Sequence, residues 1–65
     1  MATVKYTELL QLNEYNCFNV VKSIVKQLEK EDTLATADEF IREIVYYCNN
    51  KYDVIRTIYK YAKVE

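Results

Sequence analysis

The chain of 65 residues contains no glycine and no proline. Glycine provides the backbone freedom needed by tight hairpin turns, by loops that wrap around phosphate groups and by the sharp elbows that present catalytic nucleophiles. The sequence therefore argues against all three features. Changes of chain direction must instead be made by Asn, Asp and Thr, and three short segments qualify: 13–16, 31–36 and 49–50.

Between these turns, apolar residues recur with the 3.6-residue period of an α-helix. The clearest pattern lies between the first two turns, where we expect a helix that is capped by Asn13 or Asn16 and ends near Glu31. Its inner face holds Cys17, Val20, Val21, Ile24 and Leu28, with Phe18 and Val25 at the edge.

Two further helices carry capping signals at their starts. Thr36 and Glu39 have the spacing of a capping box, in which a hydroxyl and a carboxylate each satisfy a free amide of the first turn. Asn50 and Asp53 repeat this capping pattern for the last helix. The inner face of the first of these helices is predicted to be Ala37, Phe40, Ile41, Ile44, Val45, Tyr47 and Cys48, and that of the last Val54, Ile55, Ile58, Tyr61 and Ala62.

A weaker helix over residues 5–12, with Tyr6, Leu9 and Leu10 inward, completes the pattern. We therefore predict a single helical domain over residues 1–65. Its fold class is all-α, a compact bundle of three or four short helices whose neighbours run antiparallel because the loops are short.

The apolar faces are too wide for so small a bundle. A chain of this length buries only about 60% of the surface that its unfolded form exposes. The apolar arcs of the two middle helices each span roughly 160°, against the ~100° typical of a surface helix. We therefore expect a homodimer, or an exposed groove that receives a partner. The alternative is that the first helix and the tyrosine side chains cover these arcs.

Charge and cysteine content limit the possible partners and setting. The net charge is −1, with acidic residues gathered in 29–43 and basic residues in 51–63, so no general attraction to nucleic acid or to an anionic membrane is expected. No membrane span or signal peptide is recognisable. Cys17 and Cys48 fall on apolar faces, which favours free thiols in a reducing, cytoplasmic setting. Two thiols without histidine make a poor zinc site, so neither a metal nor a cofactor is predicted.

Catalysis finds little support in the sequence. Without histidine, general acid–base chemistry would depend on carboxylates, tyrosines or lysines, and neither cysteine has a recognisable base. Asp38, Glu39 and Glu43 share a helix side, as paired carboxylates or metal ligands do, yet acids near a helix N-terminus are also favoured by the helix dipole. We expect no catalytic residue and predict that the protein is not an enzyme.

The expected functional surface is an aromatic-basic row on the last helix. Tyr52, Arg56, Tyr59 and Lys63 follow an i, i+4, i+7, i+11 spacing and face outward, with Lys60 alongside. Tyr46 adds an outward aromatic ring on the preceding helix. Tyr and Arg are favoured at protein interfaces, whereas cations and rings together also bind phosphates and bases. The alternative is that these are ordinary solvated side chains.

A protein partner is favoured over nucleic acid, because few phosphates could be contacted and the row holds no Asn or Gln to read bases. We therefore predict a small, non-enzymatic protein-interaction module that occludes a partner protein through this row and Tyr46. The alternative function is a small dimeric helical DNA-binding protein, in which two copies double the basic surface.

The segment 48–59, CNNKYDVIRTIY, resembles the second loop and last helix of ubiquitin-associated domains. Those domains have a glycine-containing first loop that this chain does not have, so no ubiquitin-binding residue is carried over. The composition, free of glycine and rich in Tyr and Asn, is also similar to that of small accessory proteins of viruses and phages. Such proteins often act by occupying a host protein, which would make this chain an inhibitor or adaptor.

Overall fold

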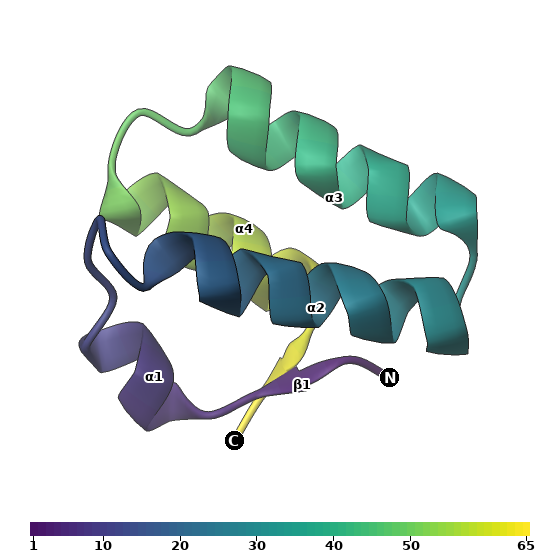
Figure 1. The fold of residues 1–65 in the computed structure, drawn as a ribbon, viewed down its shortest axis with the longest axis horizontal. Coiled ribbons are helices and arrows are strands. Elements are labelled where there is room, and N and C mark those ends of the chain that lie inside the picture. Colours follow the sequence, from purple (N-terminus) through teal and green to yellow (C-terminus); the bar gives the residue numbers. More distant parts are fainter.

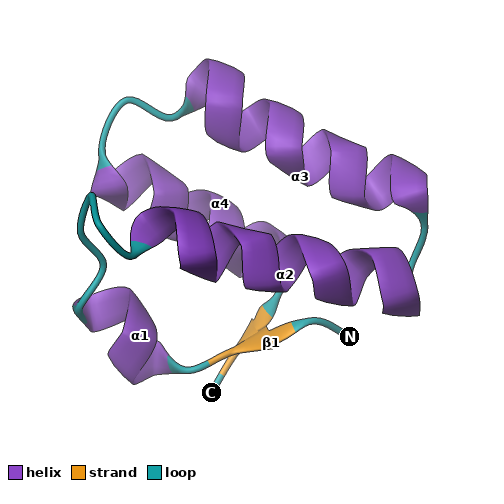
Figure 2. Ribbon diagram, viewed as in Figure 1, coloured by secondary structure: helices purple, strands orange, loops and turns teal.

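Four helices and one short parallel sheet make up the computed structural model, which describes residues 1–65 (Figure 1). The expectation of an all-α chain is wrong in one respect, because the two ends of the chain form strands (Figure 2). In chain order the elements are β1 (Thr3–Val4), α1 (Tyr6–Leu10), α2 (Cys17–Glu31), α3 (Leu34–Tyr47), α4 (Lys51–Tyr61) and β2 (Lys63–Val64).

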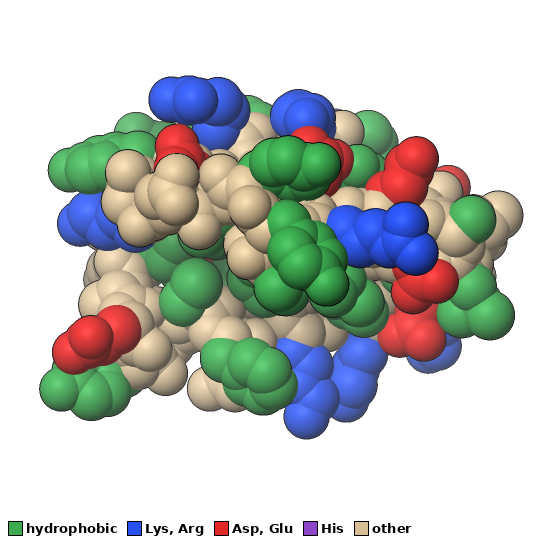
Figure 3. Space-filling model, turned by 90° about the horizontal axis from the view of Figure 1, so that it is seen from above, with side chains coloured by type: hydrophobic (Ala, Val, Ile, Leu, Met, Phe, Trp, Pro, Cys, Tyr) green, Lys and Arg blue, Asp and Glu red, His purple; other side chains and the backbone are tan.

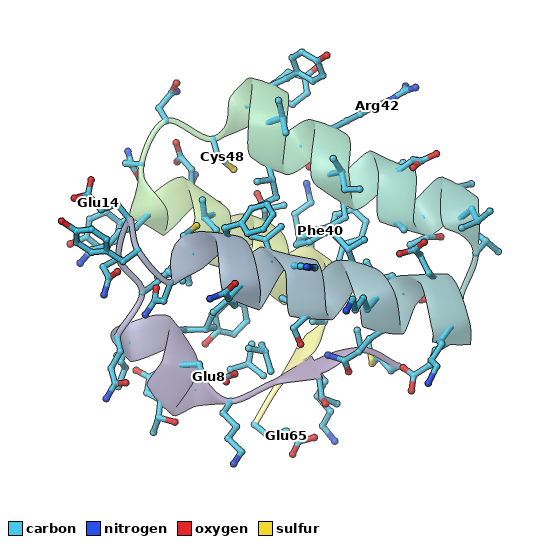
Figure 4. All side chains as sticks on the ribbon, viewed as in Figure 1. Glu8, Glu14, Phe40, Arg42, Cys48 and Glu65 are labelled. Atoms are coloured by element: carbon cyan, nitrogen blue, oxygen red, sulfur yellow. The ribbon has the colours of Figure 1, made fainter.

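The three longer helices enclose the core. α2 and α3 form an antiparallel hairpin, α4 packs against α3, and the short α1 and the sheet lie below α2 in the view of Figure 1. The largest fully buried side chains are Phe40, Ile24, Leu28 and Ile58. Each contributes roughly 1.5–3 kcal/mol by leaving water. Phe40, labelled in Figure 4, lies between helices and meets the Tyr61 ring edge-on, with a centroid distance of 5.3 Å.

The turns are built by Asn and Thr, as expected, although not always at the expected residue. The Asn50 side chain caps α4 by accepting a hydrogen bond from the Asp53 amide (3.0 Å). α3 begins earlier than predicted, because Thr33 and not Thr36 is its N-cap; the Thr33 hydroxyl accepts from the Thr36 amide (3.1 Å). An N-cap hydroxyl needs only a free backbone amide three residues later, so Thr33 meets this requirement three residues before Thr36 does.

At the start of α2, the side chains of Asn13 and Asn16 each accept hydrogen bonds from backbone amides of the turn. Asn16 is the N-cap residue, but its side chain accepts from the Asn13 amide (2.8 Å) rather than from the helix. The Asn13 side chain in turn accepts from the amides of Tyr15 and Asn16. No residue of the chain has a positive φ angle, so the turn needs no glycine, and these side-chain hydrogen bonds hold it.

The parallel sheet was not predicted. Thr3 pairs with Lys63 and Val4 with Val64, so a segment near the start of the chain lies beside a segment near its end (Figure 2). Ala2 and Val4 are buried and join the core. Strands of two residues are too short to show an alternating pattern, and the pairing joins opposite ends of the chain, so sequence periodicity could not reveal it.

The free edge of β1 is covered by one side chain of α2. Gln27 accepts from the Thr3 amide through Oε1 and donates to the Thr3 carbonyl through Nε2, both at 2.9 Å. The side-chain amide thus pairs with the backbone of Thr3 much as a neighbouring strand would. This amide clip fastens the N-terminal strand to the helical body.

Several residues predicted to face inward are exposed. On α1, Leu9 is buried, but Tyr6 and Leu10 are not. On α3, Val45 and Tyr47 are largely exposed, and Ile41 is partly so. α3 contacts α2 and α4 over a narrower arc than its apolar residues span, so one side of that arc remains open. None of the four helices has both the length and the hydropathy needed to cross a membrane.

Candidate interaction surfaces

Three of the residues predicted for the aromatic-basic row lie on α4 with exposed side chains. Tyr52 and Tyr59 are 66% and 53% exposed, and Arg56 is also exposed between them. Arg56 approaches Asp53 of its own helix at 3.8 Å, a solvent-exposed pair that holds it weakly. Lys51 Nζ lies 5.5 Å from the centre of the Tyr52 ring and adds a cation to this end of the row.

The two lysines at the other end are placed differently from the prediction. Lys63 is not on the helix, because α4 ends at Tyr61 and Lys63 belongs to β2, where it pairs with Thr3. Ala62 already has extended backbone angles, φ −135° and ψ 153°. Strand pairing with β1 therefore accompanies the end of the helix at Tyr61, two residues before the row is complete.

Lys60 is engaged within the fold. Glu43 of α3 accepts hydrogen bonds from Lys60 and from the Tyr61 hydroxyl, which ties α3 to the C-terminal turn of α4. The bond from Lys60, followed by that from Tyr61, lowers the pKa of the Glu43 carboxyl. The bond to Glu43, with partial burial, raises the pKa of Tyr61 to about 12. Lys60 thus has a structural partner and offers less free charge to a ligand.

Tyr46 is 76% exposed but belongs to a different surface. It borders a shallow hollow on α3 together with Asp38, Ile41, Arg42 and Val45. Arg42 points away from the body of the molecule in Figure 4. The structure therefore separates the predicted residues into two groups, the α4 row and the α3 surface around Tyr46.

The most apolar concavity is a groove between α2 and α3, which we call the α2–α3 groove. It has a volume of about 670 Å³ and is lined by Glu14, Cys17, Phe18, Val21, Lys22, Val25, Ile41, Ile44 and Val45. Phe18 and Val45 are 71% and 64% exposed. Figure 3, seen from above, shows hydrophobic side chains along the middle of this side of the molecule with charged side chains around them.

The groove was foreseen only in outline. The wide apolar arcs of the two helices predict uncovered apolar surface, and these helices do leave such surface between them. Tyr15, in the turn before α2, was not singled out although it is 85% exposed. No periodic pattern marks a turn residue, so only its residue type could have drawn attention to it.

A second concavity is wholly polar and lies along the outer face of α2. It is lined by Asn19, Lys22, Ser23, Lys26, Gln27, Glu29 and Lys30. Three lysines follow one another at intervals of four residues here, with one glutamate among them. We interpret it as the solvated side of an amphipathic helix, because no aromatic side chain lines it.

Both cysteines pack against the core as partly buried side chains. Cys17 and Cys48 are free and half-buried, and Cys48 Sγ lies 3.4 Å from the Thr57 hydroxyl. Burial, and to a lesser extent the neighbouring Cys48, raises the pKa of the Cys17 thiol. A thiol with a raised pKa stays protonated at neutral pH and is a poor nucleophile. No group of three or more Cys, Asp or Glu side chains is arranged to hold a metal ion.

Comparisons of the chain with protein-family models, with curated proteins and with solved structures find no match.

Proposed function

We propose that this protein is a small, non-enzymatic interaction module that acts by covering a surface of a partner protein. The observation that carries the proposal is the outward arrangement of Tyr52, Arg56 and Tyr59 on α4. The row contributes little to the fold, because both rings are more than half exposed and Arg56 makes only a weak pair within its own helix. Tyrosine and arginine are, with tryptophan, the residues enriched among the side chains that dominate binding at the centres of protein interfaces.

The charge of the row favours a protein over a nucleic acid. Of the three predicted cations, Lys60 is bound to Glu43 and Lys63 lies on β2, which leaves Arg56 on the exposed face of α4. Lys51, beside the Tyr52 ring, adds one positive group that was not predicted. Each phosphate contact normally requires a cation, and nucleic-acid affinity rests largely on such contacts. The alternative of a DNA-binding protein therefore has less support than it had from sequence alone.

We also propose that the module works as a homodimer, because the α2–α3 groove leaves apolar side chains exposed. Exposed apolar patches on small proteins commonly mark association sites. The row on α4 and the groove use different residues, so a dimer formed through the groove would carry two copies of the row. Tyr46 borders a hollow that shares Ile41 and Val45 with the groove, so it lies beside the dimer contact in this arrangement.

The test compares partner capture by the unchanged protein and by the double variant Arg56→Glu/Tyr59→Ala. Both proteins are immobilised and exposed to the same cell extract, and bound proteins are compared by mass spectrometry. We expect the double variant to lose a partner that the unchanged protein retains, while its helical circular dichroism is unchanged. If both proteins retain the partner equally, the row is not the surface that binds it.

A matched control carries the same kinds of substitution away from the row. Lys5→Glu/Tyr6→Ala alters an exposed lysine and an exposed tyrosine near α1 and is expected to keep the partner. Light scattering with mixed-sequence DNA at low and moderate salt tests the alternative. Salt-sensitive binding that disappears in Arg56→Glu/Tyr59→Ala would replace the protein partner with nucleic acid.

A further inference from the structure

The α2–α3 groove has an arrangement of charges that matches a second copy of itself. Only two charged residues line it, Glu14 and Lys22. Phe18 lies midway between them in sequence. Among the apolar residues of α2 that line the groove, Phe18 is the most exposed. Such a surface, with an apolar centre, a negative charge on one side and a positive charge on the other, is complementary to a second copy of itself related by a two-fold axis.

The backbone places these three residues in line. The Cys17 amide donates to the Asn13 carbonyl (3.0 Å) and the Val20 amide to the Asn16 carbonyl (3.1 Å), so helical hydrogen bonding reaches back beyond the first residue of α2. Glu14, Phe18 and Lys22 are therefore spaced by four residues along one side of a helix. Figure 4 shows Glu14 beside the start of α2, at the end of the groove.

We propose that the occupant of the groove is a second copy of this chain, packed with its α2 antiparallel and a two-fold axis beside Phe18. This proposal rests on the homodimer of the proposed function and names its interface. The axis brings the two Phe18 rings together and sets Glu14 of each copy against Lys22 of the other, on both sides of the axis. One surface thus provides both halves of each ion pair.

The same axis accounts for the exposed Tyr15. Tyr15 and Val21 are equally far from Phe18 in sequence, in opposite directions, so Tyr15 of one copy lies over Val21 of the other. Its ring, 85% exposed in the single chain, would cover the part of the groove that the first copy's own side chains leave open. Val45 of α3, exposed on the same side, is covered in the same step.

The available surface is sufficient for a stable contact. A typical specific interface removes about 800 Å² from each partner. The single chain exposes 4784 Å² in all, so about one-sixth of its surface is required. One side of a molecule whose principal extents are 27 × 26 × 18 Å meets this requirement.

The test is the dissociation constant of the dimer, measured by sedimentation equilibrium of the full chain over a wide concentration range. We expect Phe18→Glu to raise it by at least about tenfold, because two carboxylates would meet at the axis. Tyr52→Glu is the matched control: it puts the same charge at an exposed aromatic position on α4 and should leave the constant unchanged.

Charge exchange tests the geometry itself. Glu14→Lys and Lys22→Glu should each raise the dissociation constant by about five- to thirtyfold, because each places like charges opposite one another on both sides of the axis. The double variant Glu14→Lys/Lys22→Glu restores opposite pairs and should return to within about twofold of the unchanged protein. Failure of this rescue would overturn the antiparallel pairing.

Other outcomes are equally decisive. A protein that stays monomeric at every concentration would overturn the second copy as occupant, and if such a monomer binds an apolar dye that Phe18→Glu abolishes, the groove belongs to a different protein. A dimer that tolerates Phe18→Glu would place the interface elsewhere. A monomer would also overturn the homodimer of the proposed function, but none of these results bears on partner capture by Arg56→Glu/Tyr59→Ala, so the α4 row is tested separately from the groove.

Discussion

Gln27→Ala is the substitution that most directly tests how the N-terminal strand is held. The change removes the amide clip, whose two hydrogen bonds to Thr3 are both 2.9 Å long. A typical intramolecular hydrogen bond contributes about 0.5–1.5 kcal/mol, and these two are partly exposed to solvent, so their sum is about 1–2 kcal/mol. Because alanine is a better helix former than glutamine, the substitution also stabilises α2 by a few tenths of a kcal/mol.

The expected net loss is therefore about 1 kcal/mol in the free energy of unfolding. A chain of this size has a free energy of unfolding of roughly 3–10 kcal/mol in total, so a loss of this size is measurable by urea denaturation. It corresponds to about 4–8 °C in melting temperature. Gln11→Ala is the matched control, because the Gln11 side chain makes no hydrogen bond within the protein.

Hydrogen exchange localises the effect. The Thr3 amide donates to Gln27, so its exchange should accelerate in Gln27→Ala by more than that of the α3 amides, which follow only the change in the global free energy of unfolding. Gln27→Glu is more specific still, because its carboxylate can accept from the Thr3 amide but cannot donate to the Thr3 carbonyl. Below about pH 4.3 the neutral acid regains a donor and should recover stability relative to the unchanged protein. If Gln27→Ala matches Gln11→Ala in stability and in Thr3 exchange, the clip does not hold the strand.

Two further predictions concern the core and the α3–α4 contact. Ile24→Asp should abolish helical circular dichroism, since Ile24 is fully buried and an unpaired charge there costs several kcal/mol. Ile44 is only half-buried, at the floor of the groove, so Ile44→Asp should lose less of the helical signal. An equal loss of helical signal in both variants would contradict this assignment. The pKa of Tyr61 is raised from 10.0 to about 12, so its hydroxyl should ionise near pH 12 in an ultraviolet absorbance titration. Its contribution to stability is present below pH 10 and lost as the pH rises towards 12. The lowered pKa of Glu43 gives a contribution to stability that is present above pH 4.5 and lost as the pH falls through the folded pKa. Glu43→Gln should abolish this acid dependence and lower the pKa of Tyr61, and an unaltered Tyr61 titration in this variant would refute the contact.

Long helices with continuous periodicity were predictable from the sequence. The bounds of α2 and the inward positions of Ile24, Leu28, Phe40 and Ile58 follow from the 3.6-residue pattern, and the Asn50 cap follows from its spacing to Asp53. These features depend on residues close together in the chain. Local physical chemistry is sufficient to specify them.

Features that depend on distant parts of the chain were not predictable. Lys63 continues the spacing of the α4 row, but pairing of β2 with β1 draws it out of the helix. Tyr47 lies within an apolar arc, but no neighbouring element covers it and it is 75% exposed. Lys60 was expected to be free, yet Glu43, which lies 17 residues earlier, engages it. In each case a tertiary contact, or the absence of one, outweighs the local pattern.

The pairing of β1 with β2 also sets an order for folding. Thr3 and Lys63 must come together across nearly the whole chain, and the entropy of closing so long a loop is recovered only once the intervening segments are compact. The α2–α3 hairpin, in contrast, closes over a two-residue connection. We therefore expect the hairpin to be structured in the folding transition state and the two chain ends to join last. Substitutions at Val4 should then accelerate unfolding and leave the rate of folding nearly unchanged.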